Sequence, residues 1–133
     1  MNVLGIPLSD FQNIFEKMKL ARTKTPRFHE EAYFFLMEAL TFTVSKLAEP
    51  RHITGPELLF GIREFTVQRF GKMSKTVLNH WGIFTTDDFG QIVFDLVDAE
   101  VLRKQPNDKF EDFHAVYDFH QTFEKDFIIS EDV

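Results

Sequence analysis

A helix start between Thr54 and Glu57 constrains the fold more than any other feature of this chain. Thr54 can cap the first turn, and Glu57, three residues later, can bond back to the cap. Pro56 falls within that first turn, where no backbone N–H is needed. Gly71 stands where a left-handed residue would end the helix. The sequence therefore predicts a well-defined helix over 54–70.

The same kinds of signal predict four further helices. Ser9 and Gln12 have capping-box spacing, and so do Thr85 and Asp88. Apolar residues recur at helical spacing after each start, and Gly82 stands at a helix end. We expect these helices over about 9–22, 28–47, 74–80 and 86–99.

A short β-hairpin is expected after the last of these helices. Residues 101–105 are typical of a strand, and 106–108, with sequence Pro-Asn-Asp, of a turn. The apolar residues that follow alternate as in a strand and also repeat as in a helix. We favour a return strand over 110–117 and a short final helix.

Together these elements predict a mostly α domain with a minor antiparallel hairpin. A chain of 133 residues fits one compact domain. We divide it into an N-terminal helical pair (1–52), a middle part (53–118) and a C-terminal tail (119–133). The expected core consists of Phe15, Leu36, Leu40, Leu58, Ile62, Phe65, Val77, Leu78, Trp81, Phe89, Val93 and Leu96.

Residues 54–118 resemble a winged-helix domain. MSKTVLNHWGI corresponds to the first helix and turn of a helix-turn-helix, and TTDDFGQIVFDLVDAEVLRK to a recognition helix that runs into a wing strand. QPNDKFEDFHAV corresponds to the wing. This resemblance implies a fold more than a function. A helical bundle with a terminal hairpin would give much the same pattern, so both interpretations stay open.

The net charge of −6 is divided unevenly along the chain. Residues 1–83 hold eleven Lys and Arg against eight Asp and Glu, whereas residues 84–133 hold four against thirteen. A DNA-reading helix presents basic or amide side chains, and carboxylates would repel the phosphates. We therefore expect an acidic ridge on the fifth helix that contacts protein rather than DNA. Its members are Asp87, Asp88, Asp95 and Asp98.

Two basic stretches keep an alternative open. A nucleic-acid-binding or regulatory protein could use them if they converged on one face, away from the fifth helix. The candidate contacts are Lys17, Lys19, Arg22, Lys24, Arg27, Arg69, Lys72 and Lys75.

Phenylalanine usage points to an interaction role. The chain has 17 phenylalanines, and the helix expected over 28–47 is apolar on most sides. Such a helix is either central in a core or covered by a second chain. Taken with the divided charge, this favours a protein-interaction or adaptor module, expected to be dimeric.

The chemistry of the sequence favours no enzyme. It has no cysteine, no Gly-x-Ser-x-Gly elbow, no Walker loop and no dinucleotide-binding glycine motif. Asp112 with His114, and Asp118 with His120, could in principle assemble a zinc or iron site. Scattered histidines are more often surface residues, so we expect no metal, no cofactor and no small-molecule substrate.

No apolar run reaches the roughly 18 residues of a membrane span, and the N-terminus lacks the pattern of a signal peptide. The absence of cysteine fits a reducing compartment. We therefore expect a soluble cytoplasmic protein.

Three stretches, HITGPELLFGIREFTVQRFG, FGKMSKTVLNHWGI and DFGQIVFDLV, resemble a family of small uncharacterised bacterial proteins. That family occurs mainly in planctomycete and verrucomicrobial genomes. The likeness covers residues 28–119. It implies a bacterial origin and brings no activity and no site residues.

Overall fold

The computed structural model describes residues 2–3 and 11–125 and is mostly helical, as the sequence predicts. The α-helices are α1 (Phe11–Lys24), α2 (Glu30–Ser45), α3 (Gly55–Phe70), α4 (Ser74–His80) and α5 (Thr86–Asp98). The short elements are β1 (Asn2–Val3), β2 (Leu102–Arg103), the 3-10 helices η2 (Gly71–Met73) and η3 (Phe110–Phe113), and the π-helix η4 (His120–Lys125).

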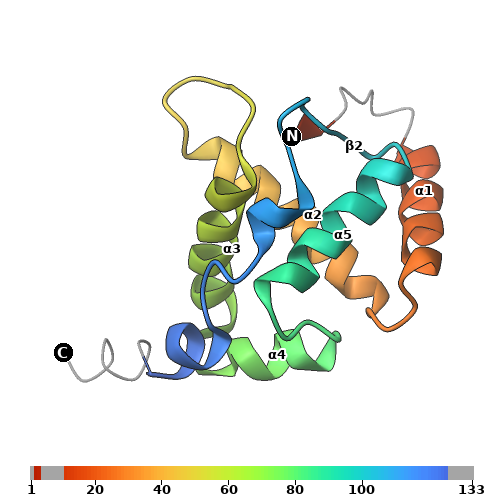
Figure 1. The fold of residues 1–133 in the computed structure, drawn as a ribbon. Helices are drawn as coiled ribbons and strands as arrows, with labels where there is room; N and C mark the ends of the chain where they lie inside the picture. Colours follow the sequence, from red (N-terminus) through yellow and green to blue (C-terminus); the bar gives the residue numbers. More distant parts are fainter. Residues whose placement is uncertain (1, 4–10, 126–133) are drawn as a thin grey trace.

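Helix α5 runs through the middle of the molecule (Figure 1). It packs against α1 and α2, and η3 covers another side of it. Helix α2 lies between α3 and the α1–α5 pair. These contacts bury Ala32, Tyr33, Phe35, Leu36, Ala39 and Leu40, so packing within one chain explains much of the apolar character of α2. The buried side chains form a single core that includes residues from α1, α2, α3, α4, α5 and η4.

The predicted helix signals are confirmed for α3. The Glu57 N–H donates to Thr54 Oγ1 over 3.2 Å, and the Thr54 N–H donates to Glu57 Oε1 over 2.9 Å. Pro56 lies in the first turn. Gly71 caps the other end at φ 52°, a conformation that favours glycine.

The predicted helix signals are also confirmed for α5, where Thr85 and Asp88 form a capping box. Gly82, which follows α4, adopts φ 88°, and a Cβ there would lie 2.4 Å from the Arg27 carbonyl oxygen. A glycine is therefore required where the turn after α4 passes the connection between α1 and α2.

The helix ends differ from the predicted ones by a few residues. The expected cap Ser9 lies outside the described residues, and α1 continues to Lys24. Helix α2 is shorter than expected, because His29 caps it by accepting a hydrogen bond from the Glu31 N–H at Nδ1 over 3.1 Å. The short final helix corresponds to η4.

The predicted hairpin is wrong. Strand β2 pairs with β1, Asn2 opposite Arg103, and residues 110–117 form η3 and turns instead of a return strand. The predicted turn at Pro106 is present.

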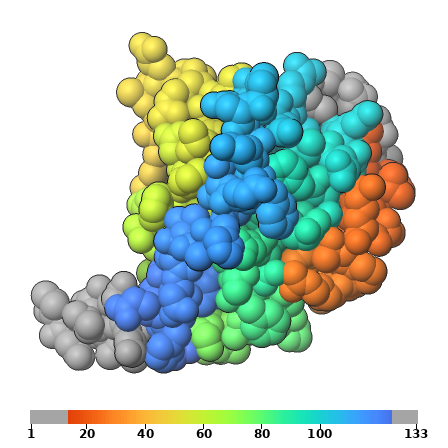
Figure 2. Space-filling model, viewed as in Figure 1, coloured from red at the N-terminus to blue at the C-terminus, as the bar shows by residue number. Residues whose placement is uncertain are grey.

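Phe113 explains why no return strand forms. Its fully buried ring lies where Gly55 and Gly90 have no side chain; a Cβ on Gly90 would lie 2.7 Å from Phe113 Cβ. Thr86 Oγ1 donates to the Phe113 carbonyl and accepts from the Val116 N–H, so side-chain bonds replace ladder bonds. This segment lies over α3 and α5, as the blue surface in Figure 2 shows.

The expected core is mostly confirmed. Phe15 is the clear error: it is 42% exposed and packs on Phe34 at the edge of α1. Three further residues, Phe65, Val77 and Trp81, are partly buried. The fully buried members are Leu36, Leu40, Leu58, Ile62, Leu78, Phe89, Val93 and Leu96.

Candidate functional site

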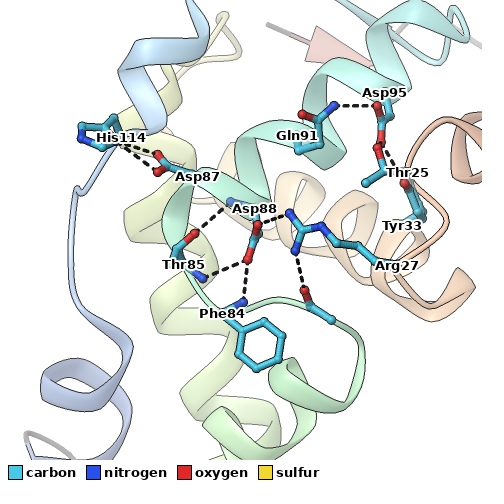
Figure 3. Close-up of polar contacts among 11 residues, drawn as sticks. Thr25, Arg27, Tyr33, Phe84, Thr85, Asp87, Asp88, Gln91, Asp95 and His114 are labelled. Atoms are coloured by element: carbon cyan, nitrogen blue, oxygen red, sulfur yellow. Dashed lines mark hydrogen bonds and ion pairs between the residues drawn. The ribbon is translucent and has the colours of Figure 1, made fainter.

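Asp95 does not belong to an acidic surface ridge, because it is only 2% exposed. Its Oδ2 accepts hydrogen bonds from Thr25 Oγ1 (2.7 Å) and the Tyr33 hydroxyl (2.9 Å), and its Oδ1 accepts one from Gln91 Nε2 (2.9 Å; Figure 3). Burial, and then the bond to Asp95, raise the pKa of Tyr33 well above its usual value, so the phenol stays a neutral donor. The prediction that Asp95 faces solvent was wrong.

Asp88 is also bonded to groups within the fold. It is 7% exposed, pairs with Arg27, and accepts hydrogen bonds from the backbone N–H groups of Phe84 and Thr85 (Figure 3). Because Arg27 also donates to the Gly82 carbonyl, this cluster fastens the α1–α2 connection to the start of α5.

The remaining two carboxylates do not make a ridge by themselves. Asp87 is partly buried and lies 3.1 Å from His114 Nδ1, whereas Asp98 is exposed, as predicted. Because Asp88 pairs with Arg27 and Asp95 is buried, the predicted ridge keeps only two of its four carboxylates at or near the surface. The covered sides of α5 are a separate obstacle, because a recognition helix needs a free face to enter a groove.

The eight candidate basic residues do not form one face. Five belong to α1 and the connection after it, and three to the end of α3, η2 and α4; Figure 1 shows these parts on different sides of α5. Within the described residues, Lys17 pairs with Glu100, Arg27 with Asp88, Arg69 with Glu38, and Lys75 with Glu124. Lys19 lies over the Phe15 ring, Arg22 donates to the Phe28 carbonyl, and Lys24 is exposed.

The members of the two predicted histidine–carboxylate pairs contact other groups. Asp112 accepts a hydrogen bond from the Lys109 N–H, and Asp118 accepts one from the Gln121 N–H. His120 lies 2.9 Å from Glu124. In the part of the chain that the structure describes, no three histidine or carboxylate side chains are arranged to hold a metal ion.

An apolar hollow of about 770 Å³, which the sequence did not predict, lies along α3. We call it the α2–α3 groove. Gly61 sets the approach of the two helices, because a Cβ there would lie only 1.8 Å from Thr43 Oγ1. The lining residues are Phe42, Thr43, Lys46, Phe60, Gly61, Arg63, Glu64, Val67, Gln68 and Thr122.

The borders of the groove carry an aromatic ring and a cation. Phe60 is 45% exposed. The Arg63 guanidinium lies over the rings of Phe60 (5.0 Å) and Tyr117 (5.9 Å), and no carboxylate of the described residues is within ion-pair distance of it. Lys46 and Glu64 form an ion pair of 2.7 Å that links the two helices.

The phenylalanines are divided between core and surface. Among the phenylalanines with described side chains, six are buried, and Phe15, Phe60, Phe84 and Phe110 have substantial exposure. Phe60 is distinguished by lying beside both the groove and an arginine. One pattern in the sequence could have indicated the groove. Four residues at helical spacing, which share one face of α3, mix apolar and charged side chains: Phe60, Arg63, Glu64 and Val67.

Within the described residues, no helix combines the length and the apolar character needed to cross a bilayer. The chain matches no protein-family model, no curated protein and no solved structure.

Proposed function

We propose that this chain is a protein-interaction module that binds its partner in the α2–α3 groove. The supporting observation is the combination of an apolar hollow, an exposed Phe60 and an Arg63 without an acidic partner in the described residues. Aromatic residues and arginine are enriched among the side chains that carry binding energy at interfaces.

The polar groups of the groove favour a protein partner over a small molecule. Small-molecule sites need a few convergent polar groups with free hydrogen-bonding capacity. Here the Thr43 hydroxyl donates to the Ala39 carbonyl, and Lys46 pairs with Glu64. Apart from Arg63, Gln68 and Thr122, the remaining lining offers apolar contact, which is what a docked side chain uses.

A peptide-display selection on the immobilised protein tests this proposal. Helix-favouring peptides should be enriched on the wild type and lost on Phe60→Ser. The matched control is Phe84→Ser, since Phe84 is also exposed and lies outside the groove. Failure to enrich any peptide, or equal enrichment on Phe60→Ser, would contradict the proposal.

The proposal includes the cytoplasmic location expected from the cysteine-free composition, a bacterial origin, and no catalytic role. It admits a second copy of the chain as partner, which sedimentation velocity over a range of concentrations would detect. Of the winged-helix resemblance, the proposal retains the order of the helices α3, α4 and α5 but not the hairpin.

Nucleic-acid binding is the rival explanation. The ion pair between Arg27 and Asp88 favours it, because a carboxylate that is neutralised within the fold repels phosphates less. The separation of the basic groups weakens it, since affinity for nucleic acid grows with the number of phosphates contacted together. A gel-shift assay with DNA and RNA at low salt distinguishes the two: undetectable binding would remove the rival.

A further inference from the structure

We infer that the α2–α3 groove takes a short amphipathic helix whose apolar side chains enter the groove and whose carboxylate faces Arg63. This inference rests on the proposed function and specifies the chemistry of the partner. Three observations carry it: the unequal charges at the borders of the groove, the length of the α3 segment that lines it, and its small size.

One border of the groove carries an ion pair, whereas the other carries an arginine with no acidic partner among the described residues. Lys46 and Glu64 neutralise each other, whereas Arg63 is held in place by the Phe60 and Tyr117 rings without an acid nearby in the described residues. A guanidinium that stacks on aromatic rings keeps its donors available and binds a carboxylate with two parallel hydrogen bonds. Among the described residues, the groove therefore presents one positive charge without an acidic partner, beside an apolar surface.

The α3 wall sets the shape of the occupant. The lining residues of α3 run from Phe60 to Gln68, about 12 Å along the axis at 1.5 Å per residue. A helix that lies in such a groove uses apolar anchors at spacings of three, four and seven residues, which span about two turns. A carboxylate one turn from an anchor would then lie beside Arg63.

The size of the groove argues against a second copy as its occupant. Ten residues line it, whereas a stable dimer uses roughly 20–30 residues a side. A second hollow, of about 690 Å³, lies on the other side of the end of α2 and is lined in part by Val44, Arg51 and His52. Its arginine is not comparable to Arg63, because Arg51 pairs with Glu57. A short acidic segment fits the α2–α3 groove better than a folded domain does.

The test is a parallel display selection on the wild type and on Arg63→Glu. Peptides enriched on the wild type should carry Asp or Glu beside apolar anchors, and those enriched on Arg63→Glu should carry Lys or Arg instead. Lys104→Glu is the matched control, because it changes the net charge equally at an exposed position outside the groove. Its selected peptides should match those of the wild type.

Synthetic copies of one enriched peptide, measured by fluorescence anisotropy, make the test quantitative. Replacing its acidic residue with Gln should weaken binding to the wild type about tenfold, a loss typical of a charge-assisted hydrogen bond. The same replacement should have little effect on binding to Arg63→Gln, a variant that removes the charge without reversing it.

The outcomes separate this inference from the proposed function. The folded wild type could select peptides whose binding requires Phe60 but which show no preference for Asp or Glu. That result would overturn the inference and leave the proposed function standing. Absence of any enriched peptide would overturn both. A concentration-dependent dimer that Phe60→Ser abolishes would identify a second copy as the occupant and overturn the inference.

Discussion

The surroundings of α5 and the α2–α3 groove use charged side chains in opposite ways. Around α5, Asp88 and Asp95 are buried and every described contact is to a donor of the same fold (Figure 3). At the groove, Arg63 lies at the surface over aromatic rings, with no acid near it in the described part of the chain. The carboxylates near α5 bind groups within the fold, whereas Arg63 has no acidic partner among the described residues and is the charge that we propose to bind a partner.

This difference predicts that some residues affect the stability of the fold and others the binding of a partner. A buried carboxylate that loses its donors leaves several groups unsatisfied, which costs much folding free energy. An exposed arginine on a ring contributes little to the fold and can contribute more to recognition. Substitutions near α5 should therefore change the free energy of unfolding, whereas Arg63 should change affinity.

The largest effect is expected for Asp95→Ala. Removing this carboxylate leaves the buried Tyr33 hydroxyl and the partly buried Thr25 and Gln91 side chains without their acceptor. We expect the free energy of unfolding to fall by about 3 kcal/mol, since each buried unsatisfied group costs roughly 1–3 kcal/mol. Urea denaturation followed by circular dichroism would measure it.

Asp98→Ala is the matched control for this prediction, because Asp98 is exposed on the same helix. It should change the free energy of unfolding by no more than about 0.5 kcal/mol. Equal losses in the two variants would break the contrast between the two regions, since burial would then not decide the effect.

Gly61→Ala should have an intermediate effect and tests the geometry of the groove. Alanine favours a helix by about 1 kcal/mol over glycine, yet the new Cβ would lie 1.8 Å from Thr43 Oγ1. We expect a net destabilisation of about 1–2 kcal/mol, as in overpacked cores, together with weaker peptide binding as α2 and α3 separate.

The double variant with Thr43→Ala shows whether that contact is the cause. Removing the Thr43 hydroxyl and methyl takes away the closest clash, although Thr43 Cβ, 2.8 Å away, remains. Denaturation of the single and double variants should give a favourable coupling energy for the pair. Additive losses would place the cause of the destabilisation elsewhere.

Local signals explain why most of the helical fold could be predicted. Thr54 with Glu57 and Thr85 with Asp88 start α3 and α5 through bonds within four residues, and Gly71 and Gly82 need no distant partner to adopt positive φ. Caps and periodicity carry such information in the sequence.

Distant contacts explain what could not be predicted. Asp95 has the spacing of an exposed residue, but Thr25 and Tyr33, about 60–70 residues away, bury it. The return strand fails because Phe113 fills the space that Gly55 and Gly90 leave. The groove depends on the contact of Gly61 with Thr43, which no local pattern reveals.

The smallest effect is expected for Glu57→Gln, which tests an exposed carboxylate against the buried Asp95. The Arg51 guanidinium first, and then the Thr54 backbone N–H, lower the pKa of Glu57 to about 2. Since this pKa lies below that of the unfolded chain, near 4.5, Glu57 stabilises the fold above about pH 4.5, and the stabilisation is lost as the pH falls toward 2. Both side chains are more than a third exposed, so screening by water limits the effect to about 1 kcal/mol.

Melting curves between pH 2 and 6 would measure the contribution of Glu57. Glu57→Gln should lose stability above pH 4.5 and show a shallower pH dependence than the wild type. Arg51→Gln should reproduce most of that change, because Arg51 is the main cause of the lowered pKa, and the Thr54 N–H should retain the rest. Added salt should reduce the difference, as it does for exposed ion pairs. If Glu57→Gln instead cost as much as Asp95→Ala, exposure would not decide how much a carboxylate contributes, and the assignment of Arg63 to binding would lose its physical basis.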